Sequence, residues 1–167
     1  MAALLTSVAA AQEAMPPAGD CAPPPVQDGT ALTDSLYRWI AAHSEYETGF
    51  GIGAPPEISF CAAGSQIRYE GRDLLVEPRL HAAYDLAARR IWLVLPWDAG
   101  SLRDRSVLLH ELVHDVQFRN ADWPCPQATE EEAYRLQHDW LAEHGIASGF
   151  DWFAIRMRAK CPTGVHP

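Results

Sequence analysis

The sequence of 167 residues has no apolar run approaching the roughly 20 residues that a membrane-spanning helix requires. It is also short of positive charge, since 13 Lys and Arg residues stand against 22 Asp and Glu, for a formal net charge of −9. An acidic chain repels phosphate backbones and anionic lipid headgroups, so we expect neither nucleic acid nor a membrane surface as a partner. With 48% hydrophobic and 21% charged residues, the composition is that of one domain able to bury a core.

The first 37 residues contain no Lys or Arg, and the first basic residue of this kind is Arg38. Residues 1–11 form a stretch of apolar and small residues whose closing alanines suit a signal-peptidase site. We interpret them as a signal peptide whose true start lies further upstream; the alternative is an Ala-rich tail. Five prolines within residues 12–30 predict an extended linker, so the domain itself is expected at 31–167.

The sequence has no CxxC pair among its four cysteines, Cys21, Cys61, Cys125 and Cys161. An even number of widely spaced cysteines behind a signal peptide indicates two disulfides and a periplasmic or secreted protein. We predict the pairs Cys21–Cys61 and Cys125–Cys161, because each would attach a terminal segment to the body of the domain. The sequence alone leaves two other connectivities open, and also four buried thiols in a cytosolic protein.

Hydrophobic periodicity predicts one helix, then several strands, then further helices. The first helix is expected from Thr33 to about Glu47, burying Leu36, Trp39, Ile40 and His43. The apolar run Ile91–Leu95 indicates a strand covered on both faces. The predicted strands are 57–61, 66–69, 74–77, 81–85 and 90–95, with a hairpin turn at 86–89, and the later helices are 101–120, 128–144 and 152–160.

The helix predicted at 101–120 contains His110-Glu111-Leu112-Val113-His114, an HExxH motif. Histidines four residues apart lie on one helix face, so both imidazoles can bind a single metal ion. Glu111 then lies beside the metal and can take a proton from water bound there. The apolar flanks predict a buried helix, in which such polar residues would cost several kcal/mol without a function. The alternative is an amphipathic helix that exposes them.

Zinc needs a third protein ligand, and three consecutive glutamates open the next predicted helix: Glu130, Glu131 and Glu132. Glu130 lies on the least charged stripe of that helix, whereas Glu131 lies on a solvated face. Glu132 follows Thr129 at the spacing of a capping box. We therefore predict Glu130 as the ligand, with Glu131 as the alternative. The alternative without a metal is that all three glutamates lie at the helix N-terminus because the positive end of the helix dipole stabilises negative charge.

HELVH followed by Glu-x-x-Ala-Tyr resembles the gluzincin branch of zinc metallopeptidases, in which an E-x-x-A-[D/N/Y] helix carries the third ligand. The resemblance covers about residues 106–137 and again selects Glu130. The whole chain is similar to small bacterial proteins with HELVHDxQ and EAYxLQ segments. It implies a small α+β zincin-like domain, with a short, partly antiparallel sheet packed on the HExxH helix and on a following glutamate helix.

The resemblance implies a zinc peptidase that acts on a peptide or protein substrate through a metal-activated water, with Glu111 as the base. Tyr134 and His138 are candidates to stabilise the oxyanion, although a Tyr at this spacing is also typical of a core. The alternative is a non-catalytic zinc-binding or interaction protein that keeps the fold. Zincin helices usually have an uncharged residue after the second His, whereas this one has Asp115, which either orients a ligand imidazole or is exposed.

Overall fold

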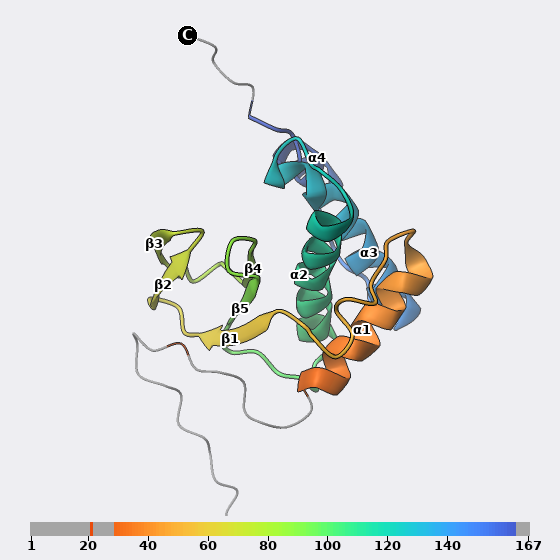
Figure 1. Cartoon of the computed structure of the whole chain (residues 1–167), viewed down its shortest axis with the longest axis horizontal. Coiled ribbons are helices and arrows are strands. Elements are labelled where there is room, and N and C mark those ends of the chain that lie inside the picture. The colour runs from red at the N-terminus through yellow and green to blue at the C-terminus, as the bar shows by residue number, and fades with distance from the viewer. Residues whose placement is uncertain (1–20, 22–28, 163–167) are drawn as a thin grey trace, which may run out of the picture.

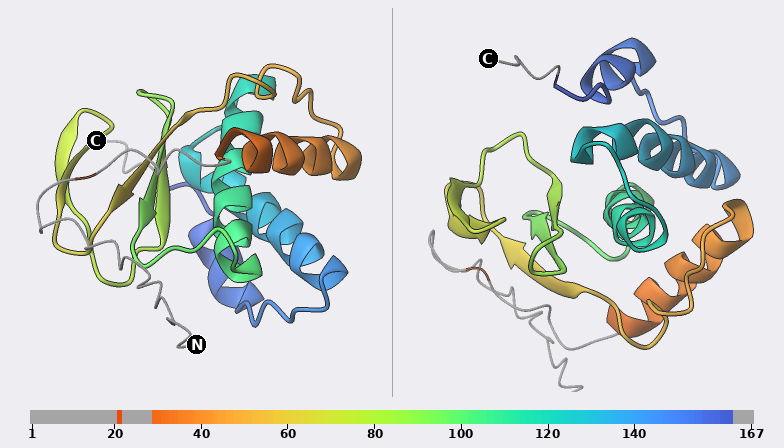
Figure 2. Two further views of the ribbon diagram at one scale, coloured as in Figure 1. Left: turned by 90° about the horizontal axis from the view of Figure 1, so that it is seen from below. Right: turned by 45° about the horizontal axis from the view of Figure 1, so that its top comes forward.

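Helix α2 (Leu102–Asn120) is the centre of the molecule. In the computed structural model, which describes residues 21 and 29–162, a small sheet lies on one side of α2 (Figure 1). Helices α1 (Gly29–His43) and α3 (Glu130–Glu143) lie on the other side, and the right view of Figure 2 looks nearly down α2 between them. The predicted α+β class is confirmed.

The main sheet has three strands in the order β1-β5-β4. Strand β1 (Glu57–Cys61) runs parallel to β5 (Arg90–Val94), and β4 (Ala82–Asp85) pairs with β5 in the antiparallel sense. Four of the five residues of β5 are buried, as the apolar run predicts. Because the strand order places β5 between β1 and β4, β4 is an edge strand, and only one of its sides pairs with another described strand.

The register of β4 determines which backbone groups point to the free edge. Val94 donates its N–H to the carbonyl of His81, and Ala82 and Tyr84 lie opposite Leu93 and Ile91. Because hydrogen-bonded pairs alternate along an antiparallel ladder, the N–H and C=O groups of Ala82 and Tyr84 point away from β5. These outward groups border the site described below.

A separate hairpin is formed by β2 (Gln66–Tyr69) and β3 (Arg72–Leu75). The third strand thus begins two residues earlier than the expected segment 74–77. Glu70 and Gly71 both have positive φ, 47° and 76°, as the two-residue turn of a tight hairpin requires. This turn aligns Tyr69 with Arg72 and so sets the register.

Helix α2 begins where Ser101 accepts a hydrogen bond from the backbone N–H of Asp104. No Gly or Pro interrupts it, and its apolar side chains are buried on several faces because other elements surround it. The buried side chains that form the middle of the core are Leu108, Leu109, Leu112, Val113 and Val116.

The remaining helices differ from expectation at their ends. Helix α1 begins at Gly29, inside the region expected to be linker, and stops at His43. His43 is not buried; its Nε2 lies 2.7 Å from Glu143 on the surface. The 3-10 helix η1 (Pro126–Thr129) precedes α3, and the last helix, α4, spans Trp152–Arg158.

Both predicted disulfides, Cys21–Cys61 and Cys125–Cys161, are present. They attach the N-terminal segment to the end of β1, and the segment before η1 to the chain after α4. Two disulfides indicate an oxidising compartment. The predicted signal peptide at 1–11 and most of the predicted linker at 12–30 lie outside the described residues. Within residues 29–162, no helix combines the length and apolarity needed to cross a membrane.

Candidate metal centre

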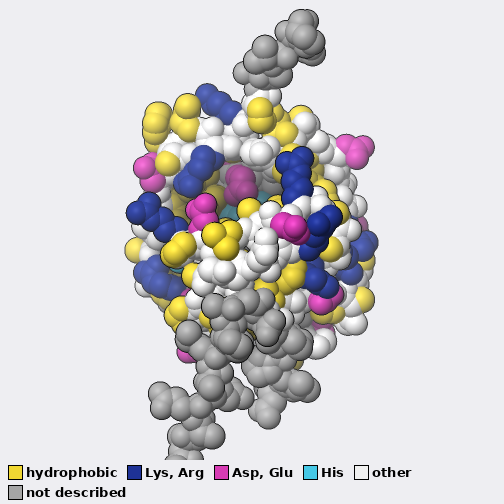
Figure 3. All heavy atoms as spheres, turned by 90° about the vertical axis from the view of Figure 1, so that its left-hand side faces the viewer, with side chains coloured by type: hydrophobic (Ala, Val, Ile, Leu, Met, Phe, Trp, Pro, Cys, Tyr) yellow, Lys and Arg dark blue, Asp and Glu magenta, His cyan; other side chains and the backbone are white. Residues whose placement is uncertain are grey.

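A cavity of about 320 Å³ opens between the edge strand β4 and helices α2 and α3. Figure 3 looks onto the face where the molecule is hollowed, with acidic and histidine side chains in the depth of the hollow. Its lining includes five side chains predicted from the sequence as site residues: His110, Glu111, His114, Glu130 and Tyr134. The structure therefore brings these five residues together at one opening.

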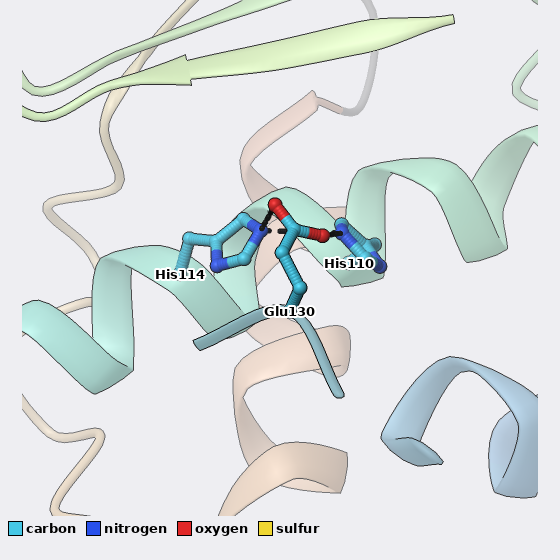
Figure 4. A group of neighbouring side chains, drawn as sticks. All are labelled: His110, His114 and Glu130. Carbon is cyan, nitrogen blue, oxygen red and sulfur yellow. Dashed lines mark hydrogen bonds and ion pairs between the residues drawn. The ribbon is translucent and has the colours of Figure 1, made fainter. Parts of the chain in front are cut away.

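His110, His114 and Glu130 point toward a common centre (Figure 4). The Nε2 atoms of the two histidines are 3.2 Å apart, and the Glu130 oxygens lie 3.5 Å from Nε2 of His110 and 3.6 Å from Nε2 of His114. A tetrahedral zinc ion with bonds of about 2.0–2.2 Å separates its ligand atoms by roughly 3.3 Å. The donor set and its spacing therefore fit a metal ion.

Glu130 reaches this centre because it is the first residue of α3, directly after η1. Its neighbours are used elsewhere. Glu131 accepts a hydrogen bond from Nε of Arg156 at 3.0 Å on the exposed face. Thr129 makes no side-chain cap, so the expected capping box with Glu132 is absent.

His114 is oriented through its other ring nitrogen. Its Nδ1 lies 3.1 Å from Oε1 of Gln117 and 3.1 Å from the hydroxyl of Thr129. The Gln117 amide nitrogen donates to the Thr129 carbonyl at 3.0 Å and to Glu132 at 3.1 Å, so its oxygen faces the imidazole. Tyr46 donates to the same carboxylate. An Nδ1–H donated to Gln117 leaves the Nε2 lone pair for a metal.

Gln117 was not identified as a site residue from sequence. Its position three residues after His114, on the same helix face, is the signal that could have suggested it. Gln117 is fully buried, which an unpaired amide would not tolerate.

His110 is held mainly by packing. Its ring meets that of Tyr134 edge to face, with centroids 4.5 Å apart, and both histidines are only 7% exposed. Burial lowers the pKa of His110, but its hydrogen bond to Glu130 and the nearby charge of Glu111 outweigh burial and leave the pKa raised.

The other two ligand candidates favour the deprotonated form that a metal requires. Burial, followed by the charge of His110, lowers the pKa of His114 to about 4. Burial acts to raise the pKa of Glu130, but its hydrogen bond with His110 and the charge of His114 lower it below the ordinary value.

Glu111 is 7% exposed, and its carboxylate is not one of the three converging groups. Burial raises its pKa to about 7, with a contribution from the charge of Glu130, while the charge of His110 and a backbone hydrogen bond from Tyr84 act in the opposite direction. Glu111 thus lies beside the candidate metal centre and against the edge strand.

Tyr134 lines the cavity, whereas His138 does not. Burial, and then the charge of Glu130, raises the pKa of the Tyr134 hydroxyl, which therefore stays protonated as a donor. Nδ1 of His138 lies 2.8 Å from the hydroxyl of Ser148, away from the metal ligands. Of the two candidates for oxyanion stabilisation, only Tyr134 is at the site.

Asp115 has neither of the roles considered from sequence. It is fully buried, and its oxygens accept hydrogen bonds from Tyr37 at 2.6 Å and Tyr84 at 2.8 Å. Arg89 binds both oxygens, at 2.9 and 3.1 Å. We call Asp115, Tyr37, Tyr84 and Arg89 the Asp115 network. It joins α2 to α1, to the edge strand and to the β4–β5 turn.

Comparison with curated proteins and with solved structures finds no match. One family profile matches residues 25–167, which include every residue of the candidate site. The chain therefore belongs to the family described as Domain of unknown function (DUF6647).

Proposed function

We propose that this protein is an exported zinc-dependent hydrolase, a peptidase of the gluzincin type. The observation that carries the proposal is an incomplete ligand set at a cavity. Three groups, His110, His114 and Glu130, converge, and within the described residues no fourth His, Cys, Asp or Glu joins them. Structural zinc sites are closed by four protein ligands, whereas catalytic sites have three and leave one position for water or substrate.

Zinc fits this ligand set because two imidazoles and one carboxylate are a common combination for it. When bound, zinc supplies Lewis acidity, which lowers the pKa of a water to about 7 and polarises a substrate carbonyl. The remaining chemistry belongs to the chain itself.

Glu111 takes the proton of the attacking water as a C–O bond forms at the substrate carbonyl carbon. It passes this proton to the amine as the C–N bond breaks. The Tyr134 hydroxyl donates to the carbonyl oxygen while negative charge develops there. Glu111 is suited to this role by its place beside the metal ligands and by the Tyr84 backbone, which holds its carboxylate.

The first experiment measures zinc by elemental analysis in the oxidised protein and in two variants, Glu130→Ala and Glu131→Ala. We expect about one zinc per chain in the parent and in Glu131→Ala, whose side chain faces solvent, but much less in Glu130→Ala. Zinc retained in Glu130→Ala would contradict the ligand assignment. Absence of zinc from the parent after incubation with the metal would refute the zinc site itself.

The second experiment separates catalysis from metal binding. Glu111→Gln keeps the size of the side chain but removes the base, so we expect full zinc content and no cleavage of a diverse peptide mixture followed by mass spectrometry. The zinc-loaded parent should cleave that mixture, and chelation should stop the cleavage. A zinc-loaded parent that cleaves nothing would instead support the non-catalytic metal protein.

A further inference from the structure

The cleft continues beyond the candidate metal centre on the His110 side. A second cavity, of about 660 Å³, shares Leu80, Ala82, His110, Glu111 and Tyr134 with the first. His110 therefore lies where the two cavities meet, whereas His114 and Glu130 line only the first. We call the cavity that contains His114 and Glu130 the ligand half, and the larger cavity the arginine half.

The two halves differ in charge. Arg79, Arg103 and Arg158 line the arginine half, whereas no Lys or Arg among residues 29–162 lines the ligand half. In Figure 3, Lys and Arg side chains surround the hollow whose depth holds the acidic and histidine side chains. Three arginines at one opening are notable in a chain with a net charge of −9.

The three guanidinium groups have capacity to bind a ligand. None of them forms an ion pair with a carboxylate in the part of the chain that the structure describes. Arg103 and Arg158 each donate once to a backbone carbonyl, at 3.2 and 3.3 Å, which leaves most of their five N–H donors available. The positive charge of Arg158 also acts on the candidate metal centre, because it contributes to lowering the pKa of Glu130.

Besides the shared Glu111, two acidic residues line the arginine half, and both accept hydrogen bonds from backbone N–H groups. Asp104 accepts from the N–H of Asp98 at 2.9 Å, and Asp151 accepts from the N–H of Ala154 at 3.0 Å. Each lies at the start of a helix, where the helix dipole favours a negative charge. Neither carboxylate forms an ion pair with any of the three arginines.

We propose that the arginine half binds a carboxylate of the substrate and thereby sets which peptides the cleft accepts and in which direction they lie. The forked donors of arginine match the two oxygens of a carboxylate. The carboxylate belongs either to an Asp or Glu side chain or to the C-terminus of the peptide, since both present the same group. This inference rests on the proposed peptidase function.

The opposite end of the cleft supports a fixed direction. Glu70 and Glu130 line the ligand half together with the apolar Leu86 and Phe118, and no Lys or Arg of the described residues does. Apolar side chains such as Val107, Leu141 and Phe150 also line the arginine half, so it is the charge of the two halves that favours one direction for a peptide with a carboxylate at one end.

The test measures peptide binding to the zinc-loaded Glu111→Gln protein, in which cleavage cannot interfere. The peptides are octapeptides with both ends blocked and a single Phe. Each acidic peptide carries one Glu, at a different position in each member of the series, and its neutral partner carries Gln at that position. A further pair compares a free with an amidated C-terminus. We expect at least one acidic peptide to bind about tenfold more tightly than its neutral partner at low salt, with the preference falling as salt rises.

Two variants identify the source of that preference. Replacing Arg79, Arg103 and Arg158 together with Gln keeps their exposed stems, and should abolish the preference while neutral peptides bind within about twofold of the parent. The control is Arg72→Gln, which removes an exposed charge on β3 outside both halves and should keep the preference. A dependence on Glu position assigns a side-chain carboxylate, and a dependence on amidation assigns the C-terminus.

The inference and the function on which it rests fail in different ways. Equal binding of acidic and neutral peptides, no binding of any peptide, or a preference that survives in the triple variant overturns the carboxylate site. Cleavage of peptides by the Glu111-containing parent without an acidic preference also overturns the site but leaves the peptidase function standing. If acidic peptides bind preferentially but the zinc-loaded parent cleaves nothing, the carboxylate site stands and the peptidase function fails.

Discussion

Replacing Asp115 with Ala should destabilise the protein more than any exposed substitution would. The change removes a buried carboxylate that accepts four hydrogen bonds. Tyr37 and Tyr84, residues that are 0% and 6% exposed, would lose the acceptor of their hydroxyls, and Arg89 would lose its ion-pair partner. Burial and then the charge of Asp115 raise the pKa of both tyrosines, so both remain protonated donors.

The magnitude follows from the burial of the group. Removing one partner of a buried ion pair costs about 3–5 kcal/mol, because the other charge is left uncompensated. The Arg89 side chain is 27% exposed, so water can replace part of what Asp115 provides. We therefore expect a loss of about 3 kcal/mol in the free energy of unfolding, which corresponds to a fall in Tm of roughly 10 °C for a domain of this size.

Unfolding in guanidinium chloride, followed by tryptophan fluorescence with a chelator present, measures this loss without a contribution from metal binding. The matched control is Asp139→Ala, which removes an exposed carboxylate 3.3 Å from Arg135 and should change stability by less than about 0.5 kcal/mol. In a double-mutant cycle, Tyr37→Phe removes one of the orphaned hydroxyls, so the double variant should lose less than the sum of the single variants. A loss below about 1 kcal/mol for Asp115→Ala, or simple additivity, would refute the Asp115 network as an anchor.

Three further outcomes are expected. Gln117→Leu should lower zinc affinity by about 10- to 100-fold in a competition titration, because Nδ1 of His114 loses the amide acceptor and keeps only the Thr129 hydroxyl; unchanged affinity would contradict that role. Gly51→Ala should cost about 1–3 kcal/mol by chemical denaturation, since a Cβ there would overlap the ring of Tyr37. Replacing Cys125 and Cys161 with Ser opens a link of sequence separation 36, for which chain entropy predicts a loss of about 4 kcal/mol, and a calorimetric loss below 1 kcal/mol would argue against it.

The parts of the site that could be predicted from sequence are those set by local geometry. Two histidines at a spacing of four must share a helix face, and the choice of Glu130 depended on the polarity of the stripe it occupies. The structure brings these three side chains together. The disulfide pairing was likewise predictable from the position of each cysteine relative to the termini.

What could not be predicted depends on partners far away in the chain. Asp115 is 78 residues from Tyr37 and 31 from Tyr84, and nothing in the local pattern shows that three separate elements supply its donors. The capping box failed for a related reason. Glu132 instead accepts hydrogen bonds from Tyr46, 86 residues away, and from Gln117. Gln117 is fully buried and therefore needs this acceptor more than the solvated end of a helix does.

These distant contacts explain how the candidate metal centre is held in place on a helix that contributes two of its three side chains. A ligand set must be held to within about 0.5 Å, so the helix that carries it has to be fixed against its neighbours. Asp115, the residue after His114, fixes α2 to α1 and to the edge strand. Gln117 fixes α2 to Thr129, the residue before Glu130. The charge of Asp115 therefore acts on the scaffold and not on the candidate metal ligands. Because each of these contacts is made within the chain, we expect the three candidate ligands to converge without a metal, unlike those of a zinc finger, which folds only with its metal.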